Sequence, residues 1–198
     1  MKKIQKYLII IFTVLFGVWS IRGTVSPLQA DNARRGAGFS ADMFPTIVSA
    51  SAGEPGFSFQ GWAAFNHIKV RAIGGHMYLP PGLTGSGGFG NQELTVAAVI
   101  ADYMFGDHFD GFWIGAGAEY WGNTISHEDT GEEFRWNNYV LTLGGGHIWR
   151  IYGNLYINPW AAVHYITNPR EFDAAGDRFS QRKIQGSFSM KIGYFFDL

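Results

Sequence analysis

Cysteine is absent from this chain of 198 residues, and neither sign of charge is in excess. Without cysteine there is no disulfide scaffold, thiolate metal site, cysteine nucleophile or lipid-modified N-terminal cysteine. The formal net charge is −1, so the chain lacks the broad basic surface with which proteins neutralise the phosphates of nucleic acid. We therefore expect no nucleic-acid partner, and no residue pattern calls for a cofactor.

Long apolar runs are also missing from most of the chain. Aromatic residues make up 17% of it and there are 27 glycines, yet the mean hydropathy is only −0.02. Apolar residues must therefore alternate with polar ones, a mixture that is typical of strands with one face in lipid. The length suits a single domain.

The N-terminal segment has the features of an export signal. Three lysines in the first six residues precede the uncharged apolar stretch Tyr7–Ile21, and Pro27 and Ala30 follow. This pattern predicts that residues 1–30 are a signal peptide cleaved after Ala30. The alternative is a retained membrane helix, but the stretch is shorter than the roughly 20 apolar residues that a bilayer span needs. Residues 31–198 would then form the mature domain.

The rest of the chain alternates apolar and polar residues at period two, with no sustained helical periodicity. Tight connections such as Asn66-His67 alternate with longer polar or glycine-rich ones such as Pro80–Asn91. This alternation is typical of membrane barrels, so we predict an all-β fold: a transmembrane antiparallel up-and-down β-barrel of about eight strands. The predicted strands are Gly36–Ser49, Phe57–Phe65, Ile68–Leu79, Gln92–Phe105, Phe112–Ser126, Phe134–Arg150, Leu155–Thr167 and Arg182–Leu198.

The last predicted strand shows the alternation most clearly. Its apolar positions fall on one face and its lysines, glutamine and serines on the other. The apolar face is expected to contact lipid. The apolar set is Ile184, Gly186, Phe188, Met190, Ile192, Tyr194, Phe196 and Leu198. A soluble β-sandwich or lipocalin-like barrel would instead turn this face inward; small residues alternating with bulky lumenal ones favour the membrane barrel.

The final eight residues resemble the terminal assembly signal of bacterial outer-membrane proteins. Lys191 supplies its polar position, Gly193 its glycine, Phe196 its aromatic residue and Leu198 its terminal hydrophobic residue. Together with the export signal and the eight strands, the chain resembles the small outer-membrane barrels of the OmpA, OmpX and OmpW type. The resemblance implies insertion into the outer membrane of a Gram-negative cell by the barrel-assembly machinery. We further expect a monomer that contacts outer-membrane lipid and lipopolysaccharide.

Charged residues at inward positions predict a polar interior. An eight-stranded barrel is just wide enough for side chains to fill, and ionised groups in so narrow a space need partners. We therefore expect a paired, hydrogen-bonded lumenal cluster, with a polar path for small solutes or protons as the alternative. The protein would accordingly be structural or allow porin-like passage. The cluster comprises Asp42, Lys69, Arg71, Asp102, Glu119, His164, Lys183 and Lys191.

No segment carries a clear catalytic pattern. Ser126 and His127 are adjacent, so on a strand they would point to opposite faces, and the segment to Asp129 is interpreted as a solvated loop tip. The segment from His164 to Asn168 comes nearest to the His-any-Ser-Asn motif of lipid A deacylases, but the serine is missing and the register is shifted by one, so a deacylase of this type is not expected. We assign no catalytic or metal-binding residue. A lipid-modifying enzyme of the outer leaflet (acyl hydrolase or transferase) and a loop-mediated adhesion or host-interaction protein remain the alternative functions.

Overall fold

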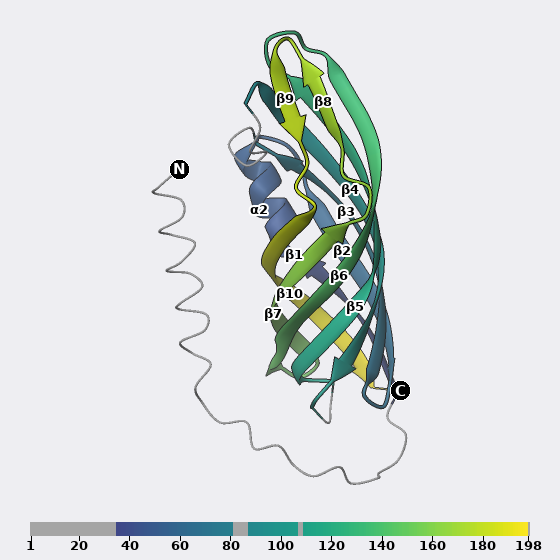
Figure 1. Ribbon diagram of the computed structural model, residues 1–198. Coiled ribbons are helices and arrows are strands. Elements are labelled where there is room, and N and C mark those ends of the chain that lie inside the picture. Colours follow the sequence, from purple (N-terminus) through teal and green to yellow (C-terminus); the bar gives the residue numbers. More distant parts are fainter. Residues whose placement is uncertain (1–34, 81–86, 107–108, 198) are drawn as a thin grey trace, which may run out of the picture. The chain divides into compact units, whose positions relative to one another are not determined.

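The computed structural model describes residues 35–80, 87–106 and 109–197. In this part of the chain eight antiparallel strands close into a barrel in the order β1-β10-β7-β6-β5-β4-β3-β2 (Figure 1). The predicted closed β-barrel is confirmed. Its strands are β1 Arg35–Asp42, β2 Phe57–Phe65, β3 Ile68–Leu79, β4 Phe89–Met104, β5 Gly111–His127, β6 Glu133–Tyr152, β7 Leu155–Ile166 and β10 Ile184–Asp197. The predicted signal peptide lies outside the described residues.

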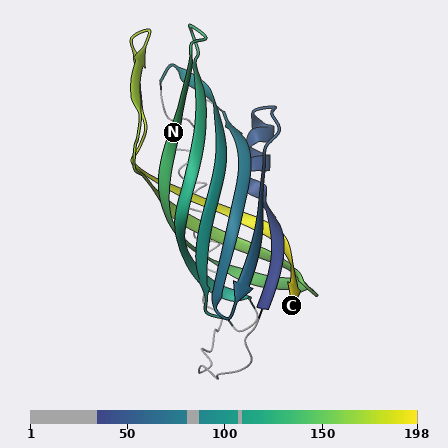
Figure 2. The same cartoon turned by 90° about the vertical axis from the view of Figure 1, so that its right-hand side faces the viewer.

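The two ends of the barrel differ as the sequence indicated. The tight turns after β2 and β6 place Asn66 (φ 53°) and Gly153 (φ 54°) in the left-handed region that short hairpin turns require. The C-terminal end of β10 lies at the same end as these turns (Figure 1). The longer connections lie at the other end, which Figure 2 shows from the side.

Helix α2, Met43–Ser51, replaces the second half of the first predicted strand. The prediction of a strand to Ser49 was wrong because Asp42 caps a helix: its side chain accepts a hydrogen bond from the amide of Phe44 at 3.1 Å. Pro45 fits the first turn of a helix but has no N–H for a strand ladder. Among the described residues, no helix is long and apolar enough to cross a membrane.

A second element that the sequence did not predict is the hairpin of β8, Glu171–Ala174, and β9, Asp177–Ser180. It lies in the connection between β7 and β10. Phe172 on β8 stacks on Phe134 of β6 with ring centroids 4.3 Å apart, and Phe179 on β9 is only 4% exposed. The hairpin therefore covers an aromatic cluster at this end of the barrel.

Side chains alternate between the two surfaces of the barrel wall. On β5, Phe112, Ile114 and Tyr120 are 39%, 48% and 40% exposed, whereas Trp113 and Trp121 are 3% and 6% exposed. Exposed apolar side chains occur on every strand of the barrel. Examples from other strands are Phe39, Phe59, Val70, Val99, Leu141, Val163 and Ile192. A continuous apolar surface of this kind is rare in soluble monomers and suits an apolar solvent.

Candidate functional site

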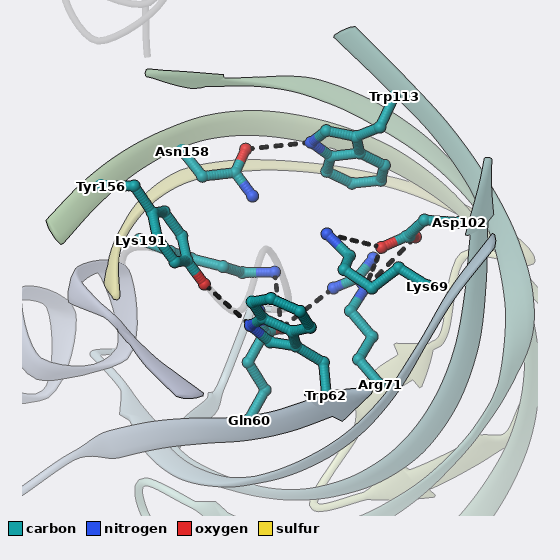
Figure 3. A network of polar contacts seen from close by, with 9 residues as sticks. All are labelled: Gln60, Trp62, Lys69, Arg71, Asp102, Trp113, Tyr156, Asn158 and Lys191. Atoms are coloured by element: carbon teal, nitrogen blue, oxygen red, sulfur yellow. Dashed lines mark hydrogen bonds and ion pairs between the residues drawn. The ribbon is translucent and has the colours of Figure 1, made fainter. Parts of the chain in front are cut away.

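A buried ionic network fills the interior near the tight turns (Figure 3). The carboxylate of Asp102 on β4 lies 3.1 Å from Lys69 Nζ and 3.0 Å from Arg71 Nε, both on β3. The register places Lys69 opposite Asp102, and alternation brings Arg71 to the same inner face. Gln60 Oε1 accepts from Arg71 Nη1 at 3.1 Å and from Lys191 Nζ at 3.2 Å. Four strands thus meet in one polar layer.

Aromatic rings complete this layer. Trp62 Nε1 donates to the hydroxyl of Tyr156 at 3.1 Å, and Trp113 Nε1 donates to Asn158 Oδ1 at 3.1 Å (Figure 3). Lys69 Nζ lies 5.3 Å from the centroid of the Trp113 ring, within range of a cation–π contact. Further buried apolar residues pack against these rings: Ala64, Met104, Phe109, Ile148 and Phe195. This half of the interior is therefore filled by side chains.

A cavity of about 370 Å³ lies in the other half of the barrel. Its wall is mainly apolar and includes residues of β3 to β7 and β10, among them Trp121 of β5 and Trp160 of β7. Apolar residues of β3 and β4 that line it include Ile73, Met77, Leu94, Val96, Ala98 and Ile100. Arg71 and Lys191 line it from the ionic network. The cavity therefore combines an apolar wall with two cationic side chains.

A second polar cluster borders this cavity and spans four strands. Glu119 on β5 accepts from Trp121 Nε1 at 2.6 Å and from Thr142 Oγ1 of β6 at 2.5 Å. His164 on β7 lies with Nδ1 2.8 Å from Thr142 Oγ1 and Nε2 2.7 Å from Ser187 Oγ on β10. His164 is 6% exposed, and its Nδ1 lies 3.4 Å from Glu119 Oε1. A serine, an imidazole and a carboxylate are thus connected inside the barrel.

Six of the eight predicted lumenal residues fall into two groups. Lys69, Arg71, Asp102 and Lys191 belong to the ionic network, and Glu119 and His164 belong to the second cluster. Asp42 lies between these groups, where it accepts from Trp160 Nε1 at 2.9 Å and from Ser189 Oγ. Ser187 was not singled out from the sequence. Its only signal is register, since Gln185 pairs with His164 and Ser187 is the next residue on the same face.

Lys183 is a correction to the predicted cluster. It precedes β10, is exposed, and places Nζ 4.9 Å from the ring centroid of Tyr165 on the outer surface. The prediction extended the alternation of β10 one residue beyond Ile184, where the strand begins. Lys183 therefore lies outside the interior.

The residues of the proposed assembly signal are distributed over both faces of β10. Lys191 is buried inside and Phe196 is 47% exposed outside. Gly193 faces the Tyr156 ring so closely that a Cβ there would lie 2.4 Å from it. Leu198 lies outside the described residues. Packing against Tyr156 thus requires glycine at this position, apart from any role in assembly.

His127 is a second correction. Its interpretation as part of a solvated loop tip was wrong, because β5 continues to His127 and the side chain is 1% exposed. Its Nε2 lies 3.3 Å from Asp177 Oδ2 of the hairpin, and Phe89 packs against its ring with centroids 5.1 Å apart. Exposure begins only at the next residue, Glu128, and continues to Glu133.

No protein-family model and no curated protein matches this sequence. Among solved structures, the chain is similar to a major outer membrane protein from Thermus thermophilus, at 12% identity and a TM-score of 0.49 over 83% of this chain and 100% of the other. It is similar to the N-terminal β-barrel domain of Pseudomonas aeruginosa OprF, at 12% identity and a TM-score of 0.49 over 85% and 100%. It is also similar to Neisserial surface protein A, at 13% identity and a TM-score of 0.43 over 84% of this chain and 96% of the other. The function of this chain therefore has to be inferred from its own residues.

Proposed function

We propose that this chain is an integral outer-membrane β-barrel whose interior binds the apolar part of a lipid-like molecule. The membrane location rests on the two surfaces of the wall. Val99 and Leu143 are 59% and 58% exposed on the outside, whereas Asn138 and Asn158 are 0% and 1% exposed inside. A soluble barrel would bury the aliphatic side chains and hydrate the amides, because burying apolar surface drives folding in water.

The outer surface also supports an orientation in the membrane. Tyr120, Tyr139 and Tyr165 lie on adjacent strands toward the long connections, and Phe112 and Trp149 lie toward the tight turns. Rings of this kind mark the two interfaces of membrane barrels. Short turns face the periplasm in such barrels, so α2 and the β8–β9 hairpin would face the cell exterior.

The filled half of the interior favours a structural or binding role over continuous porin-like passage. The ionic network and the aromatic rings around Trp113 occupy the lumen next to the tight turns. Because an eight-stranded barrel has room for little beyond its own side chains, this layer would block diffusion from end to end. Small solutes would reach the cavity and go no further.

The course of β10 supports access to the cavity from the membrane. Strand β1 pairs with β10 only from Lys191 to Asp197, and α2 packs between β10 and β3 where β1 has ended. The cavity is lined by Ser187 and also by its neighbours on β10, Gly186, which is exposed, and Phe188, which is half-buried. It therefore extends around the edge of β10 that has no strand partner, beside α2.

Binding of a fluorescent fatty acid tests this proposal. In lipid nanodiscs, the folded protein should bind cis-parinaric acid, measured by energy transfer from its tryptophans. Ala98→Trp fills the cavity and should weaken binding at least about tenfold, which corresponds to about 1.4 kcal/mol. Ala116→Trp, whose side chain would point outward, serves as the matched control and should bind like the wild type. Equal binding by both variants, or a steady single-channel conductance of the wild type, would contradict the proposal.

A further inference from the structure

The cluster of Ser187, His164 and Glu119 has the connectivity of a nucleophile, a base and an orienting acid. Thr142 Oγ1 donates to Glu119 Oε1 at 2.5 Å, so its lone pairs are free to accept from His164 Nδ1 at 2.8 Å. This assigns the proton of the neutral imidazole to Nδ1. Nε2 is then the acceptor, and Ser187 Oγ donates to it at 2.7 Å. The hydrogen bonds thus select the tautomer that a general base requires.

We propose that Ser187 and His164 hydrolyse acyl esters of membrane lipids, with the apolar cavity holding the acyl chain. The inference rests on the proposed binding function, because the substrate would enter the same cavity. Ser187, His164, Glu119 and Thr142 all line it. Ser187 and His164 are the catalytic residues. Glu119 and Thr142 are positioning residues, which act through the imidazole.

The position of Ser187 along the wall fits an ester at the edge of the hydrocarbon layer. Ile184 pairs with Tyr165, one of the three outward-facing tyrosines toward the long connections. Ser187 follows three residues farther along β10. At the rise of an antiparallel strand this is roughly 10 Å along β10, and about three-quarters of that in depth because barrel strands are tilted by about 40°. A lipid of the outer leaflet could therefore present an acyl ester to Ser187 beside α2 while its headgroup stays at the surface.

The backbone of β10 offers a donor for the oxyanion. The amide of Ile166 donates to the carbonyl of Lys183 at 2.8 Å. Because successive amides of an antiparallel strand point to opposite sides, the amide of Phe188 points to the edge of β10 that faces α2. From Ile184 to Met190 this edge of β10 is not paired with β1. The amide that follows the nucleophile is thus directed to the opening through which the ester would enter.

The reaction needs only water as a second reactant. Ser187 Oγ attacks the carbonyl carbon of the ester as its proton moves to His164 Nε2, and Glu119 Oε1, 3.4 Å from Nδ1, stabilises the imidazolium. The carbon–oxygen bond to the alcohol then breaks, and the alcohol takes the proton from Nε2. Water then attacks the acyl carbon as its proton moves to His164 Nε2, the bond from that carbon to Ser187 Oγ breaks, and Oγ takes the proton from Nε2. The products are a fatty acid and the alcohol, and the serine is regenerated.

Covalent labelling of the full-length folded protein tests the proposal. A lipophilic fluorophosphonate should label Ser187, located by peptide mass spectrometry, and the protein should hydrolyse p-nitrophenyl palmitate. Ser187→Ala should abolish labelling and, like His164→Gln, lower hydrolysis by about a thousandfold or more. The matched control is Ser126→Ala, which removes a serine beside His127 that does not line the cavity, and should leave both signals unchanged.

A second variant separates positioning from folding. Thr142→Val removes the hydroxyl between His164 and Glu119, so it should lower the rate and alter its pH profile, and Thr142→Ser should restore both. Absence of labelling in a barrel that still shifts on electrophoresis when boiled would overturn the hydrolase, as would equal labelling of Ser187→Ala. If such a barrel still binds cis-parinaric acid, the proposed binding function stands while the hydrolase fails. If binding also fails, both are wrong.

Discussion

Asp102 is the residue on which the ionic layer depends. It is 1% exposed and pairs with two cations, while Lys191 relies on Gln60 and on the Trp160 ring, whose centroid lies 4.4 Å from Nζ. Alternation along each strand is enough to predict that these side chains face inward. The pairing itself depends on strand register and rotamers, which period-two patterns leave open.

Removing this carboxylate should destabilise the barrel strongly. Asp102→Asn leaves Lys69 and Arg71 buried without a counter-charge, and breaking a buried pair in this way costs about 3–5 kcal/mol. Asp110→Asn is the control, since its pair with Arg150 at 3.4 Å is about one-third exposed and should be worth less than about 1 kcal/mol. Urea unfolding in detergent micelles, followed by the heat-dependent gel shift, measures both. If both variants lost a similarly small amount of unfolding free energy, the interior would have to be hydrated, which would contradict this prediction.

Ser187 marks the limit of what could be predicted at the candidate site. Glu119 and His164 were expected in the lumen because their own strands alternate clearly. Their connection to Ser187 crosses three strand pairs, from β5 through β6 and β7 to β10. A contact of this kind requires the stagger of each neighbouring pair, and no local pattern encodes that stagger.

At the scale of elements, strands bounded by tight turns were predictable and the two elements inserted in connections were not. The bounds of β2 and β3 agree with the prediction residue for residue, because Asn66 marks the turn between two alternating runs. Helix α2 was missed although Asp42 and Pro45 are helix-start signals. The β8–β9 hairpin was missed because each strand has only four residues, too few for period two to stand out.

The hairpin should loosen in acid. Arg178 Nη2 donates to Glu171 Oε2 at 2.7 Å, and this hydrogen bond, with that of Ser180, lowers the pKa of the Glu171 carboxyl below its ordinary value of 4.5. The folded hairpin therefore binds the proton less tightly than the unfolded one. Its contribution to stability is fully present above pH 4.5 and is lost as pH falls through the lowered pKa.

Hydrogen exchange of residues 171–180 measures this effect, after correction for the intrinsic pH dependence of exchange. Wild type should be better protected than Glu171→Gln near pH 6, and the difference should vanish toward pH 3. Glu133→Gln removes another exposed arginine pair, with Arg135, outside this hairpin and serves as the control. A difference between wild type and Glu171→Gln that is the same at every pH would show that the ion pair does not hold the hairpin.

At the scale of the whole molecule, one inversion organises the barrel: the outside is apolar, whereas the buried charged and amide side chains lie inside, among aromatic and aliphatic ones. Because paired strands satisfy one another's backbone hydrogen bonds, the closed wall can separate an ionic layer and a buried serine inside from apolar surroundings outside. Among the described residues, β1 pairs with β10 only from Lys191 to Asp197, and residues of β10 before Lys191 line the cavity beside α2. The proposed binding and chemistry therefore both depend on the apolar outer surface facing lipid.

Spin labels at neighbouring single cysteines test this inversion most directly, because the chain has no native cysteine. In lipid vesicles a label at Val99→Cys should collide often with oxygen and rarely with a water-soluble nickel chelate. A label at Ala98→Cys, one residue away and facing inward, should collide rarely with either, and Glu128→Cys in an exposed loop should favour the chelate. Nickel collisions at Val99→Cys as frequent as those at Glu128→Cys would contradict the account.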